Sequence, residues 1–257
     1  MITLLLEGWA VCATAQLILW LVQLRTKNAG IVDVGWALTF ALVVALWALR
    51  TGALPPLALV TLAWSLRLGG YLIYRGAASG AEEGRYQHLR EKWGANANTK
   101  FFVFFQAQAA LTAVLACAVV VPFVRTPSCA WPMWAGLALS AIGVAGETLA
   151  DAQLARFKRT HKGRVCDVGL WSWSRHPNYF FEWCVWLGYA VAGFAYWPIG
   201  LVALAPQAII LASIFGVTGI PPTEKQALRS KGEAYAEYQR RVARFIPMPP
   251  KSRGGVT

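Results

Sequence analysis

The stretch GLWSWSRHPNYFFEW places polar groups directly before and within an apolar run. Arg175 and His176 precede a proline that fits the first turn of a helix, and Asn178 and Glu182 then share one helical face because they are four residues apart. The first backbone N–H groups of a helix attract anions. The stretch therefore predicts an anion-binding mouth that suits a phosphate-bearing ligand. The alternative for His176 alone is a capping histidine at the membrane interface.

A second polar stripe lies in the stretch GETLADAQLARFK. Glu147 and Asp151 are four residues apart inside an apolar run, and Lys158 stays near the same face if the helix continues. Ionisable side chains in a membrane helix cost about 2.5–3.5 kcal/mol near the bilayer centre, so each needs a polar partner or a function. For these residues we favour a polar pocket over an interhelical salt bridge.

A third set, Trp64, Arg67 and Tyr71, is spaced so that the side chains project from one helical face. Arg67 must face protein or a wet cavity. It either pairs with Asp33 or Glu147 to tie helices together, or donates to a phosphate or carboxylate group. Asp33, near the start of another apolar stretch, is either a structural acid or a functional one.

The segment TEKQALRSKGEAYAEYQRRVARFIPMPP is charged and is expected to be helical up to about Arg241. Such a segment should lie along the cytoplasmic membrane surface. Tyr235, Tyr238 and the neighbouring arginines either pack as an amphipathic tail or close over a cofactor.

Membrane helices must position these residues, because 57% of the 257 residues are hydrophobic, 14% are charged and the mean hydropathy is +0.45. A soluble globule of this size is less apolar. Stretches of roughly 20 apolar residues, which cross a hydrocarbon core of about 30 Å, recur along the chain. We expect spans near 3–23, 30–50, 54–74, 101–124, 131–153, 179–196 and 198–219. The predicted fold class is an all-α integral membrane protein with about seven transmembrane helices and a cytoplasmic-surface C-terminal helix.

Lys and Arg set the predicted orientation, since positively charged loops stay in the cytoplasm. Only Arg50 and Arg125 fall on one side and Arg67 lies within a span, so the N-terminus is expected outside and the C-terminus in the cytoplasm. The net charge of +12 is spread over loops and forms no basic helix of a DNA-reading type, which argues against nucleic-acid binding. Anionic membrane lipids and a pocket for an anionic cofactor both fit this charge.

The five cysteines show no metal-ligand spacing, and their odd number in apolar surroundings argues against a disulfide framework. We therefore expect buried free thiols and no metal site. The first apolar stretch has no basic region before it, which favours a retained span over a cleaved signal peptide. No internal repeat or linker is evident, so a single polytopic domain is expected over residues 1–257.

Several stretches carry a family resemblance: IVDVGW (31–36), WSLRLGGYLIYR (64–75), GRYQHLREKWG (84–94), ADAQLARFK (150–158), GLWSWSRHPNYFFEW (169–183) and EAYAEYQRRVARFIP (233–247). With them the chain resembles the bacterial branch of the steroid 5-alpha-reductase-like superfamily, with a reductase-like C-terminal part at about 101–250. RHPNY is the most specific stretch. RHPxY is shared with membrane isoprenylcysteine carboxyl methyltransferases, whose tyrosine-rich C-terminal helix is also similar.

The resemblance implies a seven-helix protein of the bacterial inner membrane, with NADPH entering from the cytoplasm and a lipid-like enone entering from the bilayer. Hydride would pass to the carbon beta to a carbonyl while a polar group stabilises the enolate and relays a proton, and no metal is required. The implied catalytic residues are Asp33, Trp64 and Arg67. The implied cofactor-binding residues are Tyr71, Arg85, Glu147, Asp151, Lys158, Arg175, His176, Asn178, Tyr179, Glu182 and Tyr238.

The chain departs from the steroid reductases at the substrate end. In that family a Gln-Glu pair and a Tyr contact the substrate carbonyl, whereas Asp33 and Trp64 stand in the comparable places here. A Trp N–H donates a hydrogen bond but is no proton source, so we expect another lipid or prenoid in place of a steroid. Glu147 replaces an Asn of the family and is expected to face ribose, amide or Arg67.

Three functions stay open at this point. NADPH-dependent reduction of a C=C bond in a hydrophobic enone is favoured by Asn178 and Glu182 after RHP and by the ADAQLARFK helix. S-adenosylmethionine-dependent methylation of a lipophilic substrate is favoured by RHPNY and the tail. A non-catalytic lipid-binding protein of the same fold is the third. A transporter is disfavoured because no inverted repeat is evident.

Overall fold

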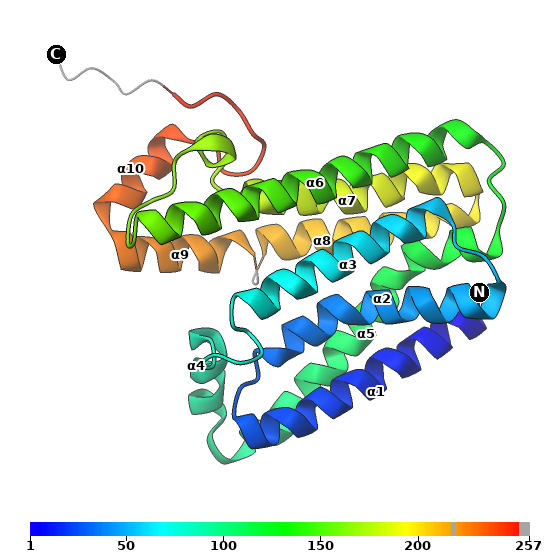
Figure 1. The fold of residues 1–257 in the computed structure, drawn as a ribbon, viewed down its shortest axis with the longest axis horizontal. Coiled ribbons are helices and arrows are strands. Elements are labelled where there is room, and N and C mark those ends of the chain that lie inside the picture. The colour runs from blue at the N-terminus through cyan, green and yellow to red at the C-terminus, as the bar shows by residue number, and fades with distance from the viewer. Residues whose placement is uncertain (217–218, 252–257) are drawn as a thin grey trace. The chain divides into compact units, whose positions relative to one another are not determined.

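The computed structural model describes residues 1–216 and 219–251, which are mostly helical (Figure 1). The α-helices are α1 (Ile2–Thr26), α2 (Ile31–Thr51), α3 (Pro56–Tyr74), α4 (Gly84–Trp93), α5 (Ala97–Val124), α6 (Ala130–Thr160), α7 (Pro177–Gly193), α8 (Leu204–Phe215), α9 (Ile220–Lys231) and α10 (Glu233–Arg241). The 3₁₀ helices are η1 (Gly94–Asn96), η2 (Gly169–Ser172), η3 (Phe194–Tyr196) and η4 (Ile199–Ala203). Within the described ranges no β-strand forms, and a single isolated bridge joins Ser174 to Ala243.

In the described part of the chain, 6 helical segments are long and apolar enough to cross a membrane. They are Ile2–Thr26, Ile31–Thr51, Pro56–Tyr74, Gly84–Val124, Ala130–Thr160 and Ile199–Lys231. The predicted sixth span is α7, whose 17 residues are about 25 Å long at 1.5 Å per residue. The prediction of an all-α integral membrane protein is thus confirmed, while its membrane and its orientation stay predictions.

Several element boundaries differ from those expected. α6 continues to Thr160, beyond the end of the predicted span at 153. Its last turns are polar, so the hydropathy of the sequence does not mark them as part of the helix. The stretch predicted as a seventh span, 198–219, divides into η4 and the 12-residue α8, and residues 217–218 lie outside the described residues. The predicted C-terminal helix is confirmed as α9 and α10, which Gly232 separates with a φ of 54°.

The described chain packs as two compact units. The first comprises residues 1–133 and 193–206, and the second comprises residues 134–192 and 207–251. The prediction of one domain over residues 1–257 stays a prediction.

Small residues let the helices of the first unit approach closely. A Cβ on Gly8 would lie 3.1 Å from the Trp47 ring and 3.2 Å from Val43, so α1 lies directly against α2. α3 is joined to α2 by the Ser65 hydroxyl, which donates to the carbonyl oxygen of Ala37 at 2.6 Å. α4 inserts the buried Tyr86 against α5. These contacts fix the helix ends that carry the polar residues of this unit.

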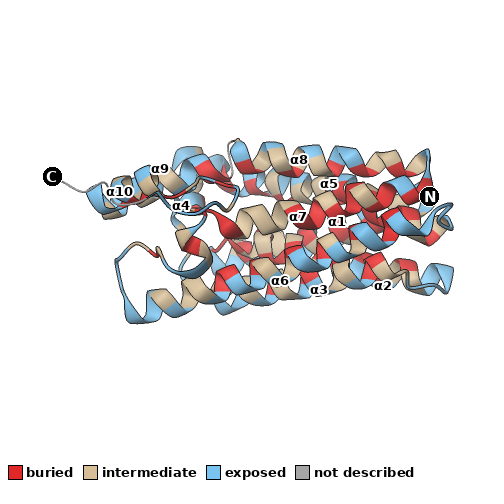
Figure 2. Ribbon diagram, turned by 90° about the horizontal axis from the view of Figure 1, so that it is seen from above, coloured by how far each residue is buried: buried red, intermediate tan, exposed pale blue. Residues whose placement is uncertain are grey.

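The second unit is built on a tight seam between α6 and α7. A Cβ on Gly143 would lie 2.7 Å from the Val185 backbone nitrogen and 2.8 Å from the Phe181 carbonyl oxygen. Ser140 donates its hydroxyl to the Val185 carbonyl oxygen at 2.9 Å. Ile142 of α6 is exposed, whereas Gly143 beside it is buried. The ribbon of α6 accordingly carries both buried and exposed residues along its length (Figure 2). Close packing of small residues is how helices associate where no water drives them together.

Candidate functional site

The start of α7 and the segment before it form a compact polar corner in the second unit. We call it the RHPNY corner, defined by residues 175–179 and the side chain of Glu224. α7 begins at Pro177, as the sequence predicted, because proline fits the first helical position. The corner is buried, since only 3% of the His176 side chain and 10% of the Arg175 side chain are exposed.

Glu224 of α9 is the acid at the centre of this corner. Its Oε1 atom accepts from Nε of Arg175 at 2.7 Å and lies 3.2 Å from Nε2 of His176. Its Oε2 atom lies 3.8 Å from Nε of Arg244. With 12% of its side chain exposed, Glu224 is the counter-ion that lets the corner hold a buried arginine.

Arg175 also holds the segment that follows α10. Its Nη1 atom donates to the carbonyl oxygens of Gln239 at 2.9 Å and Val242 at 2.7 Å, and its backbone N–H donates to Ala243 at 2.8 Å. Tyr238 donates its hydroxyl to the carbonyl oxygen of Trp171. The predicted set Arg175, His176 and Tyr238 is therefore brought together. Much of the donor capacity of Arg175 is used within the protein.

The electrostatics of the corner follow from burial. Burial lowers the pKa of His176 below its ordinary value, and this outweighs the opposing effect of the Glu224 carboxylate. His176 is therefore neutral at pH 7, with Nε2–H placed to donate to Glu224. Burial also raises the pKa of Tyr235 to about 12, so its phenol keeps its proton.

The polar faces of α6 and α7 carry the other predicted residues of this unit. Glu147 and Asp151 lie on the buried side of α6, at 6% and 5% exposure, whereas Lys158 is exposed on its last turns. On α7, Glu182 accepts from the indole N–H of Trp186 at 2.8 Å.

The remaining corner residues lie at the entrance to α7. The Tyr179 ring stacks on His176 with 5.6 Å between ring centroids, and Asn178 beside it is half-buried. Buried carboxylates and an amide are groups that bind ribose hydroxyls and carboxamides, and the exposed lysine suits a phosphate.

The first unit gathers Asp33 and Arg85 at one end of α2. Arg85 forms an ion pair with Asp33, and the Tyr86 hydroxyl donates to the same carboxylate at 2.9 Å. Nε of Arg85 also lies 3.2 Å from Glu83. The alternative of Asp33 as a paired acid is therefore observed, with Arg85 as a partner that the sequence did not indicate.

The third predicted set lies on α3, which is continuous through it. Trp64 is buried and packs edge-on against Trp36 and Phe40, with ring centroids 5.7 and 5.2 Å away. Arg67 and Tyr71 follow at the predicted spacing, and the guanidinium of Arg75 lies 5.7 Å from the Tyr71 ring centroid. The set therefore begins at an aromatic cluster and runs toward the polar end of α3.

A further polar cluster, not predicted from the sequence, braces the loop between α3 and α4. Glu82 accepts from the backbone N–H of Ala29 at 2.7 Å and from Arg90 at 2.8 Å. Although burial acts in the opposite direction, the hydrogen bonds from Arg90 and Ala29 lower the pKa of Glu82. Asn28 donates to the carbonyl oxygens of Ala77 and Gly80. Buried side-chain bonds to a loop backbone hold that loop in one conformation.

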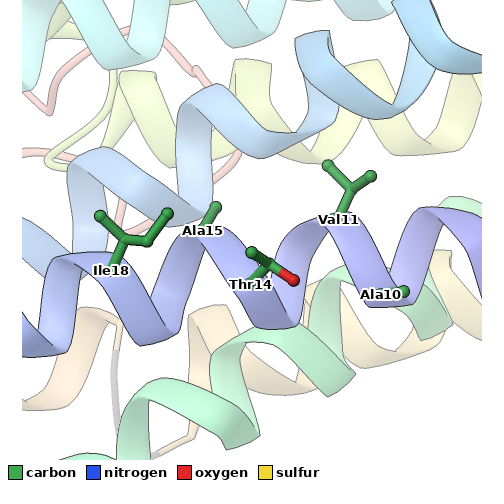
Figure 3. A pocket seen from close by; sticks show the side chains of 5 residues that line it. All are labelled: Ala10, Val11, Thr14, Ala15 and Ile18. Atoms are coloured by element: carbon green, nitrogen blue, oxygen red, sulfur yellow. The ribbon is translucent and has the colours of Figure 1, made fainter.

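The cavity drawn in Figure 3 is an open apolar depression of about 370 Å³ on α1. Its lining residues are Ala10, Val11, Thr14, Ala15 and Ile18. None of the predicted site residues lines it, so it is unrelated to the polar clusters above. Among residues 1–216 and 219–251, no three His, Cys, Asp or Glu side chains are grouped to hold a metal ion.

Comparison with known proteins gives a family but no named relative. No curated protein matches the chain, and no solved structure matches it. Residues 19–242 match the family model described as "Protein of unknown function (DUF1295)". Because this match covers most of the sequence, the chain belongs to the DUF1295 family, which is associated with steroid 5-alpha-reductase-like proteins.

Proposed function

We propose that the protein is an NADPH-dependent reductase of a C=C bond in a hydrophobic enone, of the bacterial steroid 5-alpha-reductase-like superfamily. The observation that carries the proposal is the polar face of α7, where Asn178 of the RHPNY corner is followed one turn later by Glu182. Glu182 is fixed there by the indole N–H of Trp186 at 2.8 Å. A carboxylate held in one rotamer suits the ribose or carboxamide of a nicotinamide nucleotide.

The residues of the second unit fit such a cofactor. Glu147 and Asp151 are buried acceptors, and Lys158 is an exposed cation on the last turns of α6. Arg175 and His176 act by holding the first turn of α7, because their hydrogen bonds are made to Glu224 and the C-terminal segment. The N-terminus of α7 adds a partial positive charge.

The chemistry follows from the class of substrate. When bound, NADPH would supply a hydride for the carbon beta to the carbonyl, and a proton drawn from solvent would be added to the alpha carbon. The products would be the saturated carbonyl compound and NADP⁺. Asp33, Trp64 and Arg67 are retained as the proposed catalytic residues. Trp64 can donate a hydrogen bond to a carbonyl but cannot supply the proton.

The proposal is tested by equilibrium binding of NADPH, NADH and S-adenosylmethionine to the detergent-purified protein. We expect NADPH to bind, and Asn178→Ala and Asp151→Ala to weaken it about ten-fold, which is about 1.4 kcal/mol. Asn96→Ala, at an exposed asparagine before α5, is the matched control and should leave affinity unchanged. Size-exclusion profiles establish that each variant is folded.

The other outcomes separate the alternatives. Binding of S-adenosylmethionine alone supports the methyltransferase, which the hydrogen bonds from Arg175 to the tyrosine-rich tail favour as a second candidate. Binding of no nucleotide supports a non-catalytic lipid-binding protein. Unchanged NADPH affinity in both variants removes the assignment of the cofactor to α6 and α7.

A further inference from the structure

The outer side of the RHPNY corner exposes three large apolar side chains. Trp173, Ile246 and Met248 are 48%, 56% and 52% exposed, and together we call them the apolar patch. The segments that carry them are joined, because the backbone N–H of Met248 donates to the carbonyl oxygen of Trp173 at 2.9 Å. The bridge between Ser174 and Ala243 pairs the same two segments. The patch is therefore one surface assembled from distant parts of the sequence.

The direction of these side chains is fixed by their neighbour Phe245. It points inward at 8% exposure, with its ring centroid 4.9 Å from that of Phe215 and 5.7 Å from that of Phe180. Ser174 donates its hydroxyl to the Phe245 carbonyl oxygen at 2.7 Å. With Phe245 anchored, the residues on either side of Pro247 are held outward. Ile246 and Met248 are therefore exposed because of the way this segment is folded.

The position and charge of the patch indicate what covers it. Trp173 precedes α7 by four residues, and α7, at about 25 Å, is short for a hydrocarbon core of about 30 Å. A helix of that length places the residues just before it at the level of the lipid headgroups, where Trp is favoured. Arg244, with 47% of its side chain exposed although its Nε lies 3.8 Å from Glu224, and the exposed Lys251 flank Ile246 and Met248 in the sequence and carry positive charge.

We propose that the apolar patch is inserted into the boundary between headgroups and acyl chains of the bilayer that the chain spans, with Arg244 and Lys251 at the phosphates of anionic lipids. Burial of three large apolar side chains supplies the attraction, and the two cations add the preference for negative headgroups. This contact is separate from the proposed cofactor site. It would anchor the segment after α10, which Arg175 holds on the other side.

A nitroxide spin label measures the depth of the patch directly. Met248→Cys, in a Cys129→Ser background that removes the exposed native thiol, is labelled and placed in nanodiscs of phosphatidylcholine with or without phosphatidylglycerol. We expect the label to be relaxed by oxygen, which concentrates in lipid, and not by a water-soluble nickel chelate. The control is Ser230→Cys at an exposed position on α9. Its label should show a several-fold lower ratio of relaxation by oxygen to relaxation by the nickel chelate.

Each result decides the proposal. A label at 248 that is accessible to nickel overturns it, and so does a label shielded from both reagents, which means that protein covers the patch. Phosphatidylglycerol in the bilayer should place the label deeper, and Arg244→Gln should reduce that response because Lys251 remains. An equal depth in both lipids removes the part assigned to the two cations. Because the readout is independent of nucleotide binding, its failure is distinguishable from failure of the proposed reductase.

Discussion

Replacing Glu224 by alanine removes the acid at the centre of the RHPNY corner. Arg175 loses the partner of its Nε atom and keeps only the carbonyl acceptors of Gln239 and Val242. His176 loses the acceptor for Nε2–H. The guanidinium of Arg175 then stays buried, at 10% exposure, without an opposing charge.

The magnitude follows from this burial. Breaking a buried ion pair by removing one partner costs about 3–5 kcal/mol, because the other charge is left uncompensated. Since Arg175 and Glu224 are slightly exposed, we expect the lower end of that range. The matched control is Glu233→Ala on α10, where the Arg240 pair is at 2.6 Å but the two side chains are 79% and 63% exposed. An exposed pair of this kind contributes less than about 1 kcal/mol.

The assay is unfolding in detergent followed by a thiol-reactive dye. Cys166 and Cys184 of the second unit are both 5% exposed, so they react only on opening, and Cys129→Ser in every variant removes the exposed thiol. Glu224→Ala should unfold far more readily than Glu233→Ala, and Glu224→Gln should fall between. Equal unfolding free energies for the two alanine variants would refute the idea that this buried pair holds the corner together.

Four other substitutions test further contacts. Gly143→Ala should destabilise the protein by about 1–3 kcal/mol, because its Cβ would meet backbone atoms of α7 at 2.7 and 2.8 Å. Gly70→Ala should stabilise α3 by about 0.5–1 kcal/mol, because nothing crowds the new Cβ within 4 Å. Equal unfolding free energies for Gly143→Ala and Gly70→Ala would contradict the tight packing of α6 against α7. Because burial lowers the pKa of His176 from 6.5, the unfolded chain binds its proton first, so stability is lost as pH falls below 6.5. His176→Gln should make the unfolding free energy less dependent on pH below 6.5. A plot of unfolding free energy against pH with an unchanged slope would mean that the native histidine is protonated. Asp33→Asn should lower turnover more than NADPH affinity, and full turnover would leave Asp33 as the structural partner of Arg85.

The membrane helices could be predicted because long apolar runs have few other folds available. The same reasoning missed α4, whose sequence GRYQHLREKW is polar apart from the buried Tyr86 and gives no hydropathy signal. It also predicted one helix where η4 precedes α8. There, a Cβ on Gly200 would meet the backbone of Gly193, so a close chain approach, which composition does not reveal, decides the local structure.

The site was predicted unevenly for a related reason. Spacing along one helix identified Asn178 with Glu182 and Glu147 with Asp151, because neighbours on a helical face can be read from the sequence. Glu224 was missed because its partners Arg175 and His176 lie 49 and 48 positions away. One signal could have found it, since Glu224 is the single acid of α9, a helix that otherwise carries only basic charges.

The hold of Arg175 on the segment after α10 has a consequence for biogenesis. Its acceptors at Gln239 and Val242 lie 64 and 67 residues later in the chain, and the bond from Ser174 to Phe245 spans 71. At about 5–20 residues per second, translation delivers these partners roughly 3–14 seconds after Arg175. Glu224, only 49 residues later, is translated before these carbonyl groups, so the ion pair can form before the contacts to the C-terminal segment. The contacts between the RHPNY corner and the C-terminal segment thus form late. During those seconds a chaperone or protease can recognise the incomplete corner.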